Sequence, residues 1–251
     1  MSFDTLMYCG PCRFGWEATP DSLLAAMDAS EAERAVVVAP KPPGYHLEPA
    51  NEATAELVRD RSDRLVGLAR VDPWADDAPA EAERGLAELG LGGVFLHPWE
   101  ESFRVNMPRV DPIVEVARRH GVPVVVATGF PWVSEALQVG DLASRFPEVP
   151  FVLTTGGQIN ISGLGQTDAE LATEHNANVY LQTGGVYRED FLEGIVQSFG
   201  ARRLLYASGF PQFEPRLERR RVEWAPGLSE EDRRMIMSAN ASAIFGGGRQ
   251  P

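Results

Sequence analysis

Four titratable side chains follow buried apolar runs of the sequence and suit acid–base or covalent catalysis. His97 ends the run at residues 93–97, and Glu100 follows three positions later. Tyr8 lies at the end of the first apolar run, and Lys41, the only lysine of the chain, follows the second. Histidine exchanges protons near neutral pH, and a neighbouring carboxylate can orient it or act as a base. Lysine can form a Schiff base or hold a carboxylate. These four residues are the candidate catalytic groups, although a hydrogen-bonded loop histidine and a solvated lysine are the structural alternatives.

Candidate binding residues follow the other apolar runs. Arg70 ends the third run and could clamp an anionic substrate or form a structural ion pair. Thr155, Gln158, Asn160 and Gln182 lie in or beside glycine-rich segments and offer neutral groups for an oxyanion cradle, unless turn geometry alone requires the glycines. Large aromatic residues in these loops indicate a pocket for a planar, apolar molecule, with loop packing or a subunit interface as the alternative: Trp99, Phe130, Trp132, Tyr187, Phe210 and Phe213.

The segment Cys9-Gly-Pro-Cys12 matches the redox motif of thioredoxins. In that fold the motif opens a helix after a central strand, whereas only eight residues precede Cys9 here. Alternation along a strand places Cys9 toward the helices if Tyr8 faces the interior. A disulfide or a weak metal site is left open, and chance occurrence in a Gly-Pro loop is the favoured interpretation.

The order of the elements predicts how these groups are brought together. Eight short apolar runs, typical of strands buried on both faces, lie at residues 3–9, 35–39, 65–71, 93–97, 123–127, 151–155, 178–183 and 204–208. Amphipathic segments predict helices at 22–27, 51–61, 80–88, 110–119, 134–146, 168–175, 189–199 and 229–238. Eight strand–helix pairs in 251 residues predict a single (β/α)₈ TIM-barrel domain over residues 1–251. Such barrels carry their active sites at the carboxyl ends of the strands, where the candidates lie.

Composition excludes several classes of protein. The chain is 44% hydrophobic and 24% charged, as globular proteins are, so disorder is excluded. Its formal charge of −13 argues against nucleic acid as a partner. No membrane span or leader sequence is recognisable, which predicts a cytoplasmic protein. We expect a small-molecule substrate and no cofactor, and association with a second copy of the chain is left open.

Several ordered motifs give the chain a resemblance to a known family. They are GLARVDP at 67–73, GVFLHP at 93–98, GVPVVVATG at 121–129, LTTGG at 153–157 and SANA at 238–241, followed by Ile244 and Phe245. Their order and spacing resemble the amidohydrolase-related family of metal-dependent hydrolases and decarboxylases. The resemblance covers nearly the whole chain and implies a TIM barrel.

The metal ligands of that family are missing from this sequence. The resemblance places them at Leu6, Tyr8, Ala127, Thr155 and Gly209. A divalent metal needs imidazole nitrogens, thiolates or carboxylate oxygens at such positions. The resemblance therefore implies a divergent member without a metal centre. His97 stays within the family-like motif LHP and becomes the leading titratable candidate.

Two hypotheses about function follow. The first is a metal-independent enzyme that performs acid–base hydrolysis, elimination, decarboxylation or cyclisation on a small, largely apolar molecule, in the setting of specialised metabolism. The second is a catalytically inactive pseudoenzyme that binds a ligand or a partner protein.

Overall fold

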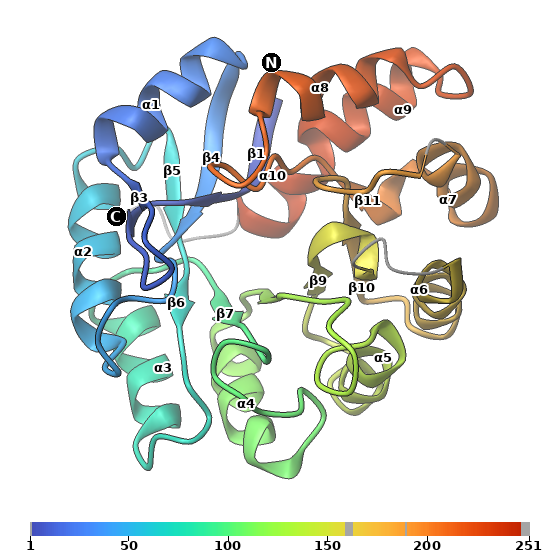
Figure 1. Ribbon diagram of the computed structural model, residues 1–251. Coiled ribbons are helices and arrows are strands. Elements are labelled where there is room, and N and C mark those ends of the chain that lie inside the picture. Colours follow the sequence, from blue (N-terminus) through green and yellow to red (C-terminus); the bar gives the residue numbers. More distant parts are fainter. Residues whose placement is uncertain (1, 159–162, 189, 247–251) are drawn as a thin grey trace.

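Eight parallel strand positions form a closed barrel surrounded by helices (Figure 1). The computed structural model describes residues 2–158, 163–188 and 190–246. The barrel strands in order are β1 (Ser2–Tyr8), β4 (Ala32–Val38), β5 (Leu65–Gly67) continued by β6 (Ala69–Arg70), β7 (Val94–Leu96), β8 (Val124–Val126), β9 (Phe151–Leu153), β10 (Val179–Gln182) and β11 (Leu204–Leu205). Each strand pairs with the next in sequence, as the eight-pair pattern predicts.

The barrel closes where the first and last strands meet. Met7 forms a parallel bridge with Phe210, and the backbone N–H of Thr5 donates to the carbonyl of Tyr206 at 2.9 Å. A short hairpin, β2 (Gly10–Pro11) with β3 (Glu17–Ala18), follows β1. The closed barrel confirms the predicted fold class.

The helices form the outer layer. They are α1 (Pro20–Ala29), α2 (Glu48–Arg59), α3 (Ala78–Ala87), α4 (Asp111–His120), α5 (Ala136–Arg145), α6 (Gly163–His175), α7 (Phe191–Phe199), α8 (Pro215–Trp224), α9 (Glu230–Arg234) and α10 (Asn240–Phe245). Short 3₁₀ turns lie at Pro108–Val110, Thr154–Gly157 and Ala201–Arg203. Among the described helices none is long and apolar enough to cross a bilayer.

Three helical segments differ from the sequence prediction, among them α10, which lies beyond the last predicted helix. The segment predicted as one helix at 229–238 begins with the expected capping box, Ser229 with Asp232, but passes into a π-helical turn at Met235–Ala239. Helix α8 was not predicted. Its buried residues are Pro215, Glu218 and Val222. The carboxylate of Glu218 interrupts the apolar face, so the sequence lacks the hydrophobic period that predicts a helix.

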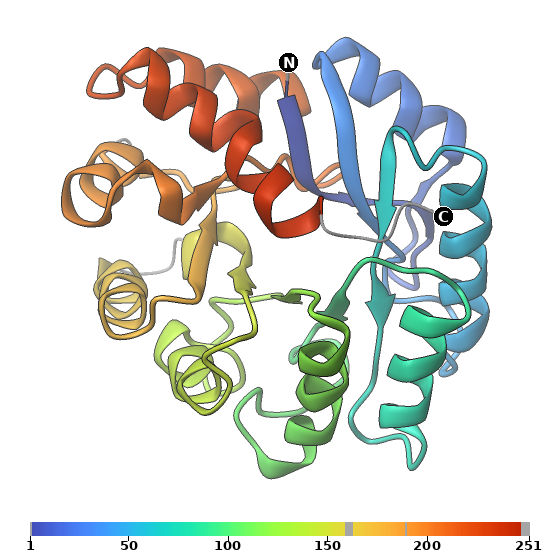
Figure 2. The same ribbon diagram turned by 180° about the vertical axis from the view of Figure 1, so that it is seen from behind.

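Two apolar layers hold the barrel together. Side chains such as Phe95, Val125 and Val152 fill the interior, and Ala241 and Phe245 of α10 pack against them. Figure 2 shows α10 across the amino-terminal end of the barrel. A larger cluster lies between the strands and the helices. Because α10 covers the amino-terminal end of the barrel, a ligand can enter only from the end at which the carboxyl termini of the strands lie.

A buried carboxyl group joins the two sides of the barrel seam. The Oδ1 atom of Asp4 accepts hydrogen bonds from the backbone N–H groups of Leu6 (3.1 Å) and Ser208 (2.9 Å). Its Oδ2 atom is buried and has no partner among the described residues. Burial raises the pKa of Asp4 from 3.8 to about 6, against the effect of the hydrogen bonds from Ser208.

We expect Asp4 to make the protein less stable as pH rises from about 4 to 6.5. Between the two pKa values the unfolded chain releases the proton while the folded chain retains it, so the free energy of unfolding falls with pH. A difference of about two pKa units corresponds to about 3 kcal/mol. Asp4→Asn, which keeps the accepting oxygen, should remove this part of the slope in urea titrations across that pH range. Asp21→Asn, at an exposed position, is the control. Parallel curves for Asp4→Asn and the unmodified protein would contradict the assignment.

Candidate functional site

A partly open cavity lies at the carboxyl ends of the strands. Its volume is about 180 Å³, and its wall is built from six of the eight strand positions and the loops that follow them. The lining residues are mostly apolar or small, with a few neutral polar groups: Leu6, Tyr8, His97, Ala127, Thr128, Phe130, Thr154, Thr155, Gln182, Gly184, Ala207, Gly209, Gln212 and Phe213.

All five positions to which the resemblance assigns metal ligands line this cavity. They are Leu6, Tyr8, Ala127, Thr155 and Gly209. The lining includes one imidazole and neither a carboxylate nor a thiol. Within residues 2–158, 163–188 and 190–246, no three His, Cys, Asp or Glu side chains converge as metal ligands. The donor set therefore does not fit a divalent metal of the kind that the family binds.

His97 is the only histidine in the lining, and Glu100 contacts both of its ring nitrogens. The backbone N–H of Glu100 donates to Nδ1 at 3.3 Å, which places the ring proton on Nε2. The Oε1 atom of Glu100 lies 3.7 Å from Nε2, too far for a hydrogen bond. Burial lowers the pKa of His97 well below its ordinary value, and the charges of Arg70 and Lys41 add to the effect. His97 is therefore a neutral group that offers an N–H donor.

Tyr8 contributes a second neutral donor to the cavity, its phenolic hydroxyl. Its ring packs edge-on against Phe95 at a centroid distance of 6.2 Å, and Phe95 packs in the same manner against His97 at 6.0 Å. Burial raises the pKa of the Tyr8 phenol, so the hydroxyl stays protonated at neutral pH. Among the described residues, no hydrogen bond engages this hydroxyl. Tyr8 and His97 thus both line the cavity as uncharged groups with a hydrogen-bond donor, and both rings pack against Phe95.

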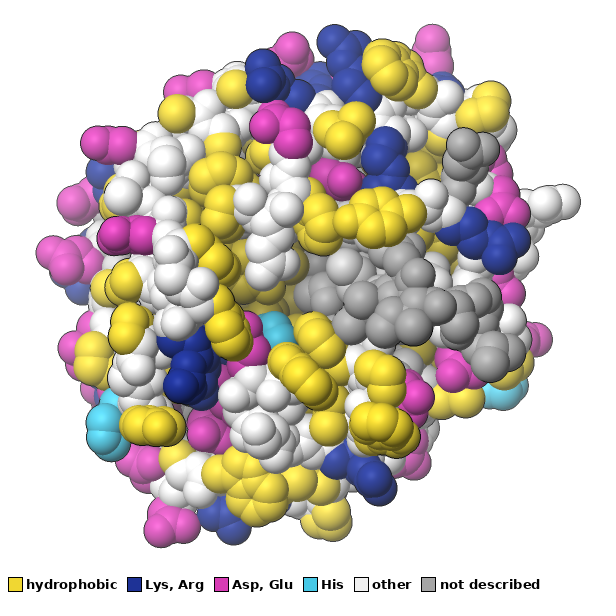
Figure 3. Space-filling view, viewed as in Figure 1, with side chains coloured by type: hydrophobic (Ala, Val, Ile, Leu, Met, Phe, Trp, Pro, Cys, Tyr) yellow, Lys and Arg dark blue, Asp and Glu magenta, His cyan; other side chains and the backbone are white. Residues whose placement is uncertain are grey.

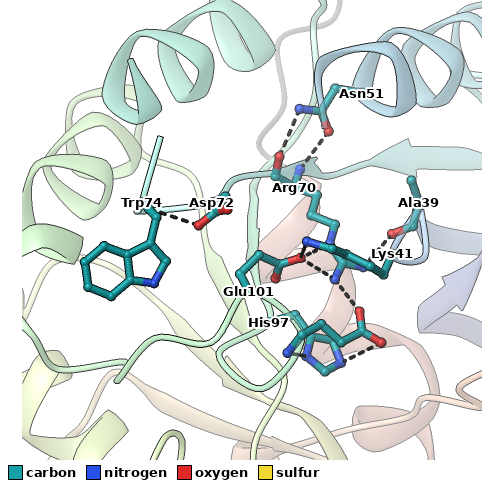
Figure 4. A network of polar contacts seen from close by, with 9 residues as sticks. Ala39, Lys41, Asn51, Arg70, Asp72, Trp74, His97 and Glu101 are labelled. Carbon is teal, nitrogen blue, oxygen red and sulfur yellow. Dashed lines mark hydrogen bonds and ion pairs between the residues drawn. The ribbon is translucent and has the colours of Figure 1, made fainter. Parts of the chain in front are cut away.

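A buried ion-pair network supports His97 from outside the cavity (Figure 4). The guanidinium of Arg70 is fully buried; its Nη2 donates to Oε1 of Glu101 at 2.8 Å and also contacts Oε2 of Glu100. Lys41 Nζ donates to the same Glu101 oxygen at 2.9 Å. Burial raises the pKa of Glu101, and the two cations oppose that rise. Asn51 fixes the backbone of Arg70 through two hydrogen bonds of 2.8 and 3.0 Å.

The predicted site residues separate into two groups. The cavity lining includes six of them: His97, Tyr8, Phe130, Thr155, Gln182 and Phe213. The other eight lie outside the lining: Lys41, Glu100, Arg70, Trp99, Trp132, Gln158, Tyr187 and Phe210, the last of which packs against the cluster of Met7, Leu23 and Met27. Lys41 and Arg70 lie outside the lining because both are paired with Glu101. The Lys41 amine that a Schiff base would need and the Arg70 guanidinium that an anion clamp would need are both engaged in this network. Arg70 thus forms a buried ion pair, as the structural alternative predicts, and its role as a substrate clamp stays a prediction. Asn160 lies outside the described residues.

The aromatic residues form a rim that leads from the surface to His97. Trp99 stacks on Phe130 with ring centroids 5.7 Å apart, and Phe130 packs against the imidazole at 5.4 Å. Trp132 is 75% exposed and Tyr187 packs edge-on against Phe213. Figure 3 shows hydrophobic side chains gathered around the centre of this face. The aromatic loops therefore surround the cavity, although only Phe130 and Phe213 of the predicted set line it.

The glycine-rich turns adopt backbone conformations that favour glycine. Thr155 and Gly156 have φ angles of 48° and 62°, in the left-handed region that glycine adopts readily. At Gly185, where φ is 70°, a Cβ atom would lie 2.6 Å from the ring of Phe213. The N–H of Gly185 donates to Glu218 at 3.1 Å. These contacts favour the interpretation that turn geometry requires the glycines.

Sequence reasoning assigned no role to several lining residues. Thr128 and Thr154 hold the ends of β8 and β9 together, since the hydroxyl of Thr128 donates to the carbonyl of Thr154 at 2.6 Å. Ala207 and Gly184 leave open space, and Gln212 lies in the loop after β11. Thr128 is a polar residue at a strand end, where the strand-end rule finds it, but its residue type alone indicates no specific chemistry. Small residues give no chemical signal in a sequence.

Cys9 and Cys12 are both free thiols. Cys9 packs against the cluster between β1 and the helices, as strand alternation predicts. Burial raises the pKa of Cys9 to about 11 and also raises that of Cys12. A thiol becomes nucleophilic as its thiolate, so this environment opposes redox chemistry.

We expect two titratable thiols per chain in protein that has been purified without a reducing agent. At neutral pH both should react with iodoacetamide more slowly than the same thiols in urea-unfolded chain, because burial disfavours the thiolate. Mass spectrometry of the alkylated protein gives both readings. Loss of one or both thiols before reduction, or faster alkylation of the folded chain, would restore the redox alternative.

Comparison with known proteins assigns the family. No curated protein matches the chain significantly. The fold is shared with 2,6-dihydroxybenzoate decarboxylase from Rhizobium and 5-carboxyvanillate decarboxylase from Sphingomonas paucimobilis, each with a TM-score of 0.77, 17% identity and 98% of both chains covered. A dihydroxybenzoic acid decarboxylase from Polaromonas, solved with manganese and 2-nitroresorcinol, has a TM-score of 0.75 and 18% identity, over 99% of this chain and 98% of its own. The amidohydrolase family model matches residues 17–247, and the chain therefore belongs to the amidohydrolase family.

Proposed function

We propose that this chain is a metal-independent enzyme of the amidohydrolase family that acts on a small, largely apolar organic molecule. One observation carries the proposal. The cavity that holds all five of the family-type ligand positions is walled by neutral groups, and its two titratable residues are His97 and Tyr8. Both carry a hydrogen-bond donor at neutral pH.

Two neutral donors in an apolar cavity suit chemistry at a carbonyl group. As water or another nucleophile adds to the carbonyl carbon, negative charge develops on its oxygen. The N–H at Nε2 of His97 and the hydroxyl of Tyr8 can then stabilise that oxygen, and such donors act more strongly in apolar surroundings than in water. Easy hydrolysis, elimination and cyclisation use this effect. Decarboxylation of an acid is less well supported, because the lining offers no cation for a carboxylate.

A ligand-binding module is the second candidate, and the geometry of His97 favours it in one respect. Nδ1 accepts the backbone N–H of Glu100, so the neutral ring has no free basic nitrogen. A binding site requires only the donor at Nε2, whereas a general base requires an acceptor. Turnover distinguishes the two candidates.

The proposal is tested with protein purified without chelators or a metal-binding affinity tag. We expect a metal content by elemental mass spectrometry well below one ion per chain. We also expect hydrolysis of 4-nitrophenyl acetate, an uncharged aryl ester, to be unchanged by EDTA, since no step depends on a metal. One tightly bound metal per chain together with loss of turnover in EDTA would overturn metal independence. If the protein binds uncharged esters but hydrolyses none of them, the ligand-binding module is favoured.

A further inference from the structure

The cavity differs in charge from a site for aromatic acids. Every lining side chain is neutral, because burial keeps the imidazole of His97 deprotonated and the phenol of Tyr8 protonated. A carboxylate moved into such surroundings loses its hydration and gains no counter-ion, which is strongly unfavourable.

The two cations near the cavity are held by carboxylates. Arg70 is fully buried against Glu100 and Glu101, and Lys41 is paired with Glu101. Neither cation lines the cavity, so a ligand carboxylate inside it would find no cationic side chain among the lining residues.

Size and shape define the ligand further. A cavity of about 150 Å³ holds a benzene ring, and this one measures about 180 Å³. Tyr8, Phe130 and Phe213 supply aromatic walls, while Ala127 and Ala207 leave space between them. The His97 and Tyr8 donors require an oxygen acceptor on the ligand.

We propose that the site binds a single-ring, uncharged aromatic molecule that carries an oxygen substituent, and that it excludes the corresponding aromatic carboxylate. This inference rests on the proposed function, in that it defines the substrate class of the same cavity. It separates this chain from its structural neighbours named as decarboxylases of dihydroxybenzoate and carboxyvanillate.

The test compares matched probes by isothermal titration calorimetry at pH 7: phenol with benzoate, and resorcinol with 2,6-dihydroxybenzoate. We expect each uncharged probe to bind at least about tenfold more tightly than its acid, because the acid buries an unpaired charge. Ala127→Leu and Leu6→Trp, which fill the cavity, should each weaken phenol binding at least about tenfold. Trp224→Ala, at an exposed position on α8 outside the lining, should leave it unchanged.

Either of two results would overturn the inference. The first is a benzoate affinity equal to or above that of phenol. The second is phenol binding that persists in every cavity-filling variant that keeps the thermal unfolding midpoint of the unmodified protein. The test is independent of turnover. Selective phenol binding without hydrolysis of 4-nitrophenyl acetate supports the inference and counts against the proposed enzyme, whereas metal-free hydrolysis with preferential benzoate binding does the reverse.

Discussion

Replacement of Arg70 by methionine is expected to lower the free energy of unfolding by about 3–5 kcal/mol. The guanidinium is fully buried and binds Glu100, Glu101 and, at 3.2 Å, the carbonyl of Ala39. Without it two carboxylates stay in the interior with only Lys41 as a cation. The loss of stability comes from the carboxylates that are left without a cationic partner rather than from an empty volume, because methionine fills much of the same space.

Urea unfolding at neutral pH measures the effect. Arg234→Met, which removes one partner of an exposed pair with Glu231, is the matched control and should change stability by less than about 1 kcal/mol. The triple variant Arg70→Met, Glu101→Leu, Lys41→Met removes most of the network and should recover part of the loss. An Arg70→Met protein as stable as the control would show that the carboxylates are solvated or protonated in the folded state.

Replacement of His97 by asparagine is expected to lower the turnover of 4-nitrophenyl acetate by about 10²–10³-fold. The asparagine oxygen can still accept the N–H of Glu100 in place of Nδ1, but nothing replaces the donor at Nε2. Glutamine extends its amide nitrogen to about the position of Nε2 and should retain part of the activity. Tyr8→Phe removes the second donor and should have an effect of similar kind.

The pH profile gives an independent measurement. Because burial lowers the pKa of His97, the neutral ring should persist throughout the range of about pH 6–8, and the rate should fall only in more acidic solution. His46→Asn, which alters an exposed histidine, is the control, and thermal unfolding verifies that each variant is folded. Undiminished turnover in His97→Asn would assign His97 a structural role and would mean that another group of the cavity stabilises the developing charge.

The sequence by itself determined the barrel and the face on which the site lies. Strands buried on both sides appear as continuous apolar runs, such as residues 123–127 and 151–155, and this signal does not depend on distant parts of the chain. The strand-end rule then selected His97, Tyr8 and Thr155, because parallel strands bring their carboxyl ends to one edge. The poor fit to a metal could also be predicted, since leucine, alanine and glycine have no side-chain ligand atoms.

Only the tertiary structure decided which polar residues reach the cavity and in what state of charge. Lys41, Arg70, Glu100 and Glu101 come from three loops or strand ends, and their mutual pairing depends on how those segments pack. Burial depends on the same packing. It sets the neutral state of His97 and the raised pKa of Asp4, neither of which follows from residue type. The functional group of a side chain follows from its residue type. Its partners and its dielectric surroundings instead depend on contacts between residues far apart in the chain.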